Sequence, residues 1–331
     1  MLSARTGAAC AALVPARVPA PTPSAVTLPS WLPLQAIEDA AARLHGQLVR
    51  TPLLPVPGLL PGLWLKAETF QATGAFKERG ALNRLLRLTP EQRRVGVAAM
   101  SAGNHAAGLA RHAQRLGVPA VIVMPAGAPR CKIDRTRGFG AEVVLSGATV
   151  AEARGRAVEL AAERGLTFVH PYDDADVIAG QGTVGLEIVD DLPTVDTVVV
   201  PVGGGGLLAG VAAAVKARRA GVRVVGVRHA RYVGGPTPDG ASLADGIAVE
   251  HLGALPLDAI ESLGVEVVGV DETAIAEAMA TLHTRAGLVA EGAGAAAVAA
   301  LLTGAVTPGP TTVAVVSGRN VDTGALTRLL Q

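Results

Sequence analysis

The sequence predicts an α/β fold of two lobes, in which parallel or mostly parallel sheets are covered by helices and a cleft separates the lobes. From about residue 35 onward, valine-rich runs of strand length alternate with alanine-rich helical segments. Continuous apolar strands separated by helices are typical of parallel sheets that are buried on both faces. Two such series occur, one before and one after about residue 172, which indicates two lobes.

The pattern places the elements in order along the chain. Strands are expected at 95–100 (VGVAAM), 119–125 (PAVIVMP), 141–147 (AEVVLSG), 197–202 (TVVVPV), 223–227 (RVVGV) and 311–318 (TTVAVVSG), with helices at about 104–116, 130–138, 149–164 and 207–220. We expect a large domain formed by residues 31–96 and 172–331, a small domain at 97–171, and a disordered leader at 1–30.

Composition and charge narrow the class of protein. The chain has 331 residues, of which 50% are hydrophobic but only 2% aromatic, so valine, leucine, isoleucine and alanine must form the core. This apolar content excludes disorder over most of the chain. A net charge of +1 with so few aromatic residues argues against nucleic-acid binding. Cys10 and Cys131 form neither a disulfide framework nor a metal signature, which fits the cytoplasm.

Two segments could be mistaken for targeting or membrane elements. Residues 1–30 are rich in alanine and proline, and their prolines and Arg17 interrupt any signal-peptide core. The uncharged run 197–215 is long enough to span a bilayer, but it contains four successive glycines, each of which costs a helix about 1 kcal/mol relative to alanine. We therefore expect no membrane span.

Four glycines at 203–206, here called the glycine loop, follow an expected strand and open an expected helix. Without Cβ atoms the backbone can wrap closely round a ligand, and the helix N-terminus offers free N–H groups to a phosphate. Gly204, Gly206 and Ala209 also fit a loose dinucleotide fingerprint. Arg228 stands where such a site would have an acidic residue, so an NADP-binding oxidoreductase is a distant alternative.

Other polar loops follow strands in the same way, because ligands of parallel sheets bind beyond the carboxyl ends of the strands. These are SAGNH (101–105) and SGRN (317–320). A lysine, Lys77, lies between Gly74 and Gly80 in TGAFKERG. Taken alone it would be a surface lysine at a helix start, but it gains weight from the loops in the same chain.

These motifs together resemble the threonine dehydratase group of fold-type-II pyridoxal-phosphate enzymes, which also holds serine dehydratases and serine racemases. The resemblance runs in order from about Arg50 to Asp322. It is carried by TGAFKERGA around Lys77, SAGNHAAGLA (101–110), MPAGAPRCKIDRTRGFGAEVVL (124–145), IAGQGTVGLE (178–187), VPVGGGGLLAG (200–210), LADGIAV (243–249), EGAGAAAVAAL (291–301) and SGRNVD (317–322). It implies pyridoxal 5'-phosphate as cofactor, an amino acid as small-molecule substrate, and a homodimer.

The resemblance also implies roles for single residues. Lys77 would form the Schiff base with the cofactor aldehyde, with Phe76 packed nearby, and would remove the Cα proton of the substrate. Asn104 would bind the ring oxygen of the cofactor, and Ser317 would meet its pyridine nitrogen. The phosphate would be held by Gly203, Gly204, Gly205, Gly206 and the backbone of Leu207.

The substrate carboxylate would bind the loop of Ser101, Gly103, Asn104 and His105. The implied reaction is α,β-elimination of a β-hydroxy amino acid, L-threonine or L-serine, to a 2-oxo acid and ammonia. A serine rather than a carboxylate at Ser317 favours elimination over transamination. A β-replacement synthase and a dehydratase for a non-standard β-hydroxy amino acid are the alternatives.

Three positions depart from the family pattern. Ala102 stands where racemases have a serine that supplies a proton, so no significant racemisation is expected. Arg228 stands where cation-binding members have a glutamate ligand. No metal site is expected, and the guanidinium is a candidate to replace the cation; the alternative is that it is merely exposed. Arg319 replaces a glycine beside Ser317 and could meet an acidic substrate group.

Overall fold

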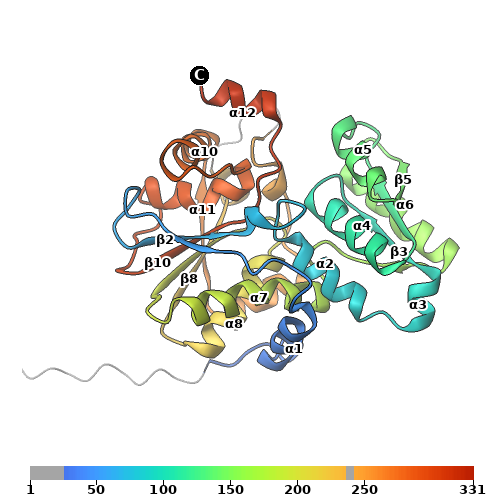
Figure 1. Ribbon diagram of the computed structural model, residues 1–331, viewed down its shortest axis with the longest axis horizontal. Coiled ribbons are helices and arrows are strands. Elements are labelled where there is room, and N and C mark those ends of the chain that lie inside the picture. The colour runs from blue at the N-terminus through green and yellow to red at the C-terminus, as the bar shows by residue number, and fades with distance from the viewer. Residues whose placement is uncertain (1–25, 236–241) are drawn as a thin grey trace, which may run out of the picture.

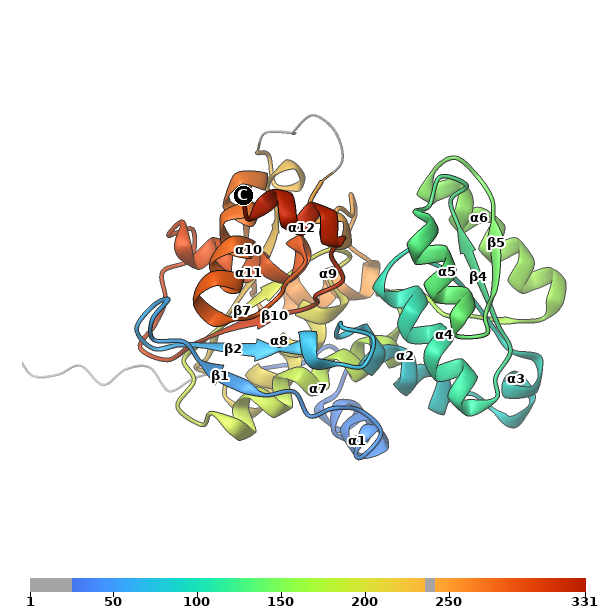
Figure 2. The same cartoon turned by 45° about the horizontal axis from the view of Figure 1, so that its top comes forward.

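The computed structural model describes residues 26–235 and 242–331, and within these residues the chain forms two separate β-sheets (Figure 1). The smaller sheet and its helices lie beside the layers of the larger one, and Figure 2 shows the same arrangement from a second direction. Both sheets are covered by helices, which confirms the predicted α/β architecture.

The larger sheet has six strands in the order β1-β2-β10-β7-β8-β9 in the described chain. All neighbours pair in parallel except β1 and β2, which pair antiparallel at one edge. The strands are β1 (Leu53–Pro55), β2 (Leu63–Ala67), β7 (Thr197–Pro201), β8 (Arg223–His229), β9 (Glu266–Val270) and β10 (Thr312–Val316). The sheet is thus mostly parallel, as predicted.

Helices cover both faces of this sheet because the central strands are apolar on both sides. Val198 and Val200 of β7 pack with helices α1, α7, α8 and α9, whereas Val199 packs with helices α10 and α11. Helices α1, α7 and α8 lie below the sheet in Figure 1, and α10 and α11 lie above it. Val26 and Leu28, from residues 26–30, also pack on the core between the larger sheet and helices α1, α7, α8 and α9.

The smaller sheet has four parallel strands in the order β5-β4-β3-β6. They are β3 (Val97–Met100), β4 (Ala120–Met124), β5 (Glu142–Leu145) and β6 (Thr167–Phe168). Ile122 and Met124 pack with helices α2, α4 and α5, and Val123 packs with helix α6 on the opposite face.

The helices and short 3-10 turns that join the strands are α1 (Leu34–Leu44), η1 (Glu68–Phe70), α2 (Lys77–Leu86), α3 (Pro90–Val95), α4 (Asn104–Leu116), α5 (Arg130–Gly138), α6 (Val150–Arg164), α7 (Ala175–Asp191), α8 (Gly206–Arg218), η2 (Ala230–Tyr232), η3 (Asp245–Ile247), α9 (Ala254–Ser262), α10 (Glu272–Ala286), α11 (Gly292–Leu302) and α12 (Thr323–Leu329). The predicted strands and helices are all found, with ends that differ by a few residues.

The uncharged run 197–215 is divided between strand β7 and helix α8, with the glycine loop between them. In the described residues no helix is long and apolar enough to cross a membrane. The predicted leader at 1–30 lies outside the described residues up to position 25, while Pro29 is buried.

The boundaries proposed for the two domains, 31–96 with 172–331 and 97–171, remain a proposal. The two sheets support it, because every strand of the smaller sheet lies within 97–171 and every strand of the larger one lies outside it. Helix α2 links the two cores: it packs on α7 and also on α4.

Close approach of backbones holds helix α2 in place. A Cβ atom on Gly180 of α7 would lie 2.7 Å from the carbonyl oxygen of Arg79 in α2, and one on Gly210 of α8 would lie 2.5 Å from the carbonyl oxygen of Ile178. Only glycine allows these helices to pack at such short range. Helix α2 is therefore fixed against the α7 and α8 layer.

The two tryptophans of the chain lie in the same region. Trp31 donates from Nε1 to Asp258 at 2.7 Å, and both Trp31 and Trp64 pack against the core formed by α7, α8 and the larger sheet. Both therefore belong to the larger sheet and its helices.

A buried ionic cluster joins α2, α7 and β2. The Arg79 guanidinium donates to both oxygens of Glu68, at 2.8 Å each, and to both oxygens of Glu187. Burial alone would raise the pKa of Glu68, but Arg79 outweighs it and holds that pKa below its ordinary value. Lys66 adds a second cation at 2.6 Å from Glu187. Since each charge compensates another, the loss of one would leave a buried carboxylate unpaired.

We expect Arg79→Leu to lower the free energy of unfolding by about 3–5 kcal/mol, because Glu68 would keep its burial and lose its cation. Urea unfolding followed by circular dichroism measures the effect. Arg94→Leu is the matched control, because Arg94 pairs with Glu91 on the surface and its loss should leave the midpoint unchanged. Equal midpoints for the two variants would contradict the prediction.

Candidate active site

Lys77 lies at the first turn of helix α2, where the chain enters from the end of the larger sheet. Its Nζ donates to the carbonyl oxygen of Pro171 at 2.8 Å and lies 5.0 Å from the centre of the Phe76 ring. The side chain is partly exposed, but protein surrounds the amine, and this burial lowers the pKa of Lys77 to about 8. At pH 7 about a tenth of the amine is therefore neutral and able to react, a far larger fraction than for an ordinary lysine.

The segment before Lys77 is tied to the end of strand β10. Ala75 and Gly318 form an antiparallel bridge, and the Phe76 N–H donates to the Ser317 carbonyl oxygen at 3.0 Å. These contacts bring Lys77 and Ser317 together although 240 positions separate them in the sequence. Ser317 is 3% exposed, and its hydroxyl donates weakly to the Ala293 carbonyl oxygen at 3.4 Å.

The glycine loop begins one residue after the end of β7, beyond Val202, and leads into helix α8. Gly205 is the N-cap of the helix with φ of +95°, a conformation that favours glycine. The loop exposes the first N–H groups of α8, with Leu207 in the first turn, at the positive end of the helix dipole. This arrangement suits an anion such as a phosphate.

Tyr172 lies directly against the glycine loop, a neighbour that the sequence alone did not single out. A Cβ atom on Gly204 would lie 2.3 Å from the Tyr172 ring, and one on Gly206 would lie 2.9 Å from the Tyr172 carbonyl oxygen. Because Lys77 binds the adjacent Pro171, the segment 171–172 connects the amine with the glycine loop. The lysine and the loop thus border one region.

Asn104, the first residue of helix α4, has both polar atoms of its side chain engaged. Its amide nitrogen donates to Glu291 at 2.6 Å, and its carbonyl oxygen accepts from Asn320 at 2.7 Å. The Glu291 main chain in turn donates to the Gly318 carbonyl oxygen. Asn104 is therefore held beside the end of β10, near Ser317.

Glu291 and Asn320 were missed as site residues by the sequence analysis. Glu291 is 5% exposed, and burial, aided by the charge of Asp245, raises its pKa to about 7. The available signal was a carboxylate next to a glycine-rich helix start in EGAGAAAVAAL, and its pairing with Asn104 depends on the fold.

The loop of Ser101 and Gly103 follows strand β3 and leads into α4. The Ser101 hydroxyl accepts from the Gly103 N–H at 3.1 Å, which shapes the loop. The His105 ring contacts the Val169 carbonyl oxygen at 3.3 Å, and burial, with the charge of Lys77 next, lowers its pKa to about 3. His105 is therefore neutral at pH 7 and can serve an anion only through its main-chain N–H.

The other singled-out residues lie around this region. Ala102 packs against the core of the smaller sheet. Arg319 is exposed, and its main-chain N–H donates to the Gly74 carbonyl oxygen at 2.8 Å. Arg228 is buried in β8, far from Lys77 in the sequence. Its guanidinium donates to the Val249 carbonyl oxygen and so belongs to a different hydrogen-bond network from that of Lys77. Within the described residues no group of three or more His, Cys, Asp or Glu side chains could hold a metal ion.

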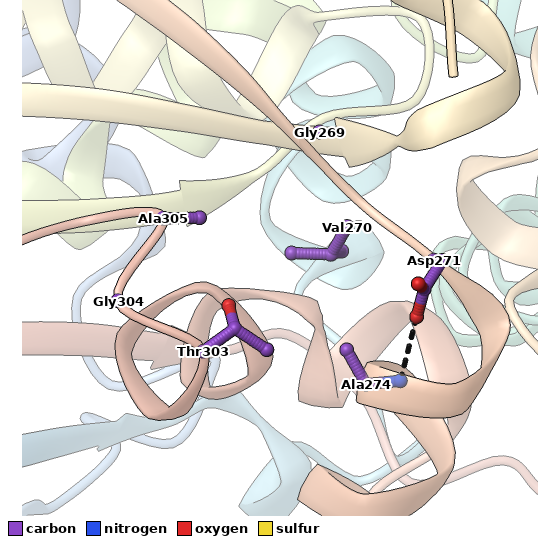
Figure 3. Close-up of a pocket in the computed structure, with 7 residues that line it drawn as sticks. All are labelled: Gly269, Val270, Asp271, Ala274, Thr303, Gly304 and Ala305. Atoms are coloured by element: carbon purple, nitrogen blue, oxygen red, sulfur yellow. Dashed lines mark hydrogen bonds between the residues drawn. The ribbon is translucent and has the colours of Figure 1, made fainter. Parts of the chain in front are cut away.

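A separate hollow lies away from these residues. It measures about 390 Å³ and is bordered by β9, α10 and the end of α11, through Gly269, Val270, Asp271, Ala274, Thr303, Gly304 and Ala305 (Figure 3). Asp271 caps α10 there by accepting from the Ala274 N–H at 2.8 Å. None of the predicted site residues lines it, so it is separate from the candidate active site.

Comparison with known proteins identifies the family. Residues 45–318 match the family described as pyridoxal-phosphate dependent enzyme. An L-threonine ammonia-lyase of Thermotoga maritima is 44% identical over 316 residues, which cover 90% of this chain and 78% of that protein.

Solved structures agree. Maize serine racemase superposes with a TM-score of 0.82 at 33% identity, covering 90% of this chain and 96% of that one. The processed form of threonine deaminase isoform 2 from Solanum lycopersicum superposes with a TM-score of 0.81 at 32% identity, covering 93% and 98%. The chain, with its two helix-covered sheets and its lysine beside a glycine loop, belongs to the family of pyridoxal-phosphate dependent enzymes.

Proposed function

We propose that the protein catalyses the α,β-elimination of a β-hydroxy amino acid, L-threonine or L-serine, to a 2-oxo acid and ammonia. The observation that carries the proposal is the partly buried Lys77, whose amine has a pKa lowered to about 8 and lies next to the segment that borders the glycine loop. The relatives named threonine ammonia-lyase and threonine deaminase support the same reaction.

The residues of the site fit pyridoxal 5'-phosphate. A lysine amine that is about half neutral at pH 8 can bind an aldehyde covalently, and the N-terminus of α8 in the glycine loop, which has no side-chain cap, offers N–H groups to a phosphate. In this assignment Lys77 would hold the aldehyde carbon, and the ring would pack near Phe76. Gly203, Gly204, Gly205, Gly206 and the Leu207 N–H would hold the phosphate. Asn104 would bind the ring oxygen, and Ser317 would meet the ring nitrogen.

When bound, the cofactor withdraws electrons from the Cα atom of an attached amino acid. With the cofactor and substrate bound, the Lys77 Nζ would act as the base that removes the Cα proton. The Cβ–O bond then breaks, and the hydroxyl group leaves as water with a proton, for which Lys77 is a candidate donor. Hydrolysis of the released enamine, after tautomerisation to the imine, consumes one water and gives the 2-oxo acid and ammonia.

The substrate carboxylate is assigned to the loop of Ser101, Gly103, Asn104 and His105. The N-terminus of α4 supplies main-chain N–H groups that lack partners within the helix. The neutral His105 ring adds no positive charge, so binding there depends on N–H donors and the helix dipole.

Glu291 and Asn320 are assigned as positioning residues for Asn104. Together they engage the oxygen and one amide proton of its side chain, which leaves the second amide proton free to donate. A fixed amide orientation would hold this donor toward the ring oxygen of the cofactor.

Arg319 keeps an acidic β-hydroxy amino acid open as an alternative substrate. The Arg319 side chain is exposed, and its main chain is bound to Gly74, which lies three residues before Lys77. The Arg135 side chain lies near Arg319 and donates to the Thr73 carbonyl oxygen at 2.7 Å. Two guanidinium groups beside one strand end would attract a second carboxylate.

A location in the cytoplasm and a homodimer complete the proposal, and the free Cys131 supports the location.

The substrate class is tested with L-threonine, L-serine, 3-hydroxyaspartate and phenylserine, with 2-oxo acid and ammonia both measured. We expect equal amounts of the two products from L-threonine or L-serine, and loss of both products with Lys77→Ala. This variant should also lose the visible absorption of lysine-bound cofactor. Full activity in a colourless Lys77→Ala protein would refute the proposal, and product formation that requires an added thiol would favour β-replacement.

The lowered pKa of Lys77 predicts how cofactor uptake depends on pH. Only the neutral amine attacks an aldehyde, so the rate of absorbance change after mixing cofactor-free protein with pyridoxal phosphate should rise about tenfold per pH unit up to about pH 8 and level off above it. An ordinary lysine would level off only near pH 10.4. A plateau that begins at that higher pH would contradict the assignment.

Ala102 predicts the stereochemical outcome, since an alanine has no proton to return to the opposite face of Cα. We expect no D-serine from L-serine, measured by chiral chromatography in deuterated water, and a gain of label and of D-serine with Ala102→Ser. Ala126→Ser, an exposed alanine of the same lobe, is the control. Rapid label incorporation into recovered D-serine by the unchanged protein would contradict the prediction.

A further inference from the structure

We propose that Arg228 is a positioning residue for the cofactor phosphate: its guanidinium holds the main chain at residues 249–250, and this segment supports the glycine loop. The inference rests on the proposed phosphate site at Gly203–Gly206. It concerns a side chain that contacts neither Lys77 nor Asn104 by any hydrogen bond in the described structure.

The guanidinium binds main-chain carbonyl groups from two segments. Nη2 donates to the carbonyl oxygens of Val249, at 2.6 Å, and Glu250, at 3.2 Å, while Nη1 donates to Tyr232 at 3.4 Å. The same group stacks on the Tyr232 ring at 5.4 Å. One planar cation therefore joins the end of strand β8 to the chain that follows η3.

Arg228 is only 7% exposed, so it is not the surface residue that the sequence left open as an alternative. Among the described residues Arg228 forms no ion pair, and its charge is faced by the carbonyl oxygens of Val249 and Glu250 and by the Tyr232 ring. Burial lowers the pKa of this guanidinium, yet arginine stays charged in proteins.

The segment that Arg228 holds packs directly on the glycine loop. A Cβ atom on Gly203 would lie 2.9 Å from the Gly246 carbonyl oxygen and 3.4 Å from the Val249 side chain. On the C-terminal side of the Val249 and Glu250 carbonyl groups, the Gly253 N–H donates to the Gly204 carbonyl oxygen at 3.0 Å. Any shift of residues 249–250 would therefore move both segments that contact the glycine loop, residues 246–249 and Gly253.

Strand pairing adds a second link. The Val202 N–H, directly before the glycine loop, donates to the carbonyl oxygen of Val227, directly before Arg228. The arginine and the loop thus begin at adjacent points on two paired strands, so the guanidinium has a fixed position relative to the loop. From this position its planar fork can reach carbonyls of two segments, which a lysine amine at the end of a flexible stem would do less well.

The test compares the cofactor-loaded full chain with Arg228→Ala and Arg223→Ala variants. Arg223 is at the opposite end of the same strand, where it forms an exposed pair with Glu266. Two measurements are made: retention of pyridoxal phosphate during dialysis, read by absorbance, and hydrogen exchange of peptides that span residues 245–253.

We expect Arg228→Ala to weaken cofactor retention about tenfold and to speed exchange in 245–253, because the Val249 and Glu250 carbonyls lose charged donors. Arg223→Ala should change neither. Millimolar guanidinium chloride, but not sodium chloride, should restore retention by Arg228→Ala, since the free ion fills the vacated site. Cofactor retention equal to that of Arg223→Ala would overturn the proposal.

If Arg228→Ala does not fold, Arg228→Lys provides the same comparison with a smaller loss of about threefold. Both readouts are independent of substrate. A failure of threonine elimination would therefore leave this test intact, whereas unchanged retention would refute the role of Arg228 alone.

Discussion

The site depends on one short pairing: the bridge between Ala75 and Gly318, with the Phe76 N–H bound to the Ser317 carbonyl oxygen. It joins the entry of helix α2 to the end of strand β10, so that the lysine amine and the serine hydroxyl border the same region. The buried cluster of Arg79, Glu68 and Glu187 fixes α2 from its other side. Because the cluster begins two residues after Lys77, the charges that stabilise the helix also determine where the amine lies.

Much of this could be predicted from the sequence, because the central strands are continuous apolar runs bounded by glycine and polar loops. Strand β7 and the start of α8 follow directly from TVVVPVGGGG. The edge strands β1 and β6 were not predicted, since with three and two residues they are too short to show a period. The strands β2 and β9 were also missed, although EVVGV of β9 has the composition of a strand.

Contacts between distant segments could not be predicted from the sequence. The pairing of Asn104 with Glu291 and Asn320 joins three helix or strand ends that lie far apart in the chain, and no local pattern signals it. For Arg228, the sequence identified an unusual residue type but could not show what surrounds its side chain. The sequence showed a cation where a carboxylate was expected, but only the fold shows that carbonyl groups surround it.

The placement of the tryptophans has an optical consequence. Trp31 and Trp64 both pack on the larger sheet and its helices, and the smaller sheet with its helices contains neither. Their emission overlaps the absorption of lysine-bound pyridoxal phosphate, so energy transfer from them senses the cofactor from one side only. Intrinsic fluorescence will therefore follow occupancy and unfolding of the larger layers, and a change confined to residues 97–168 that leaves the cofactor in place will not alter tryptophan emission unless a label is added there.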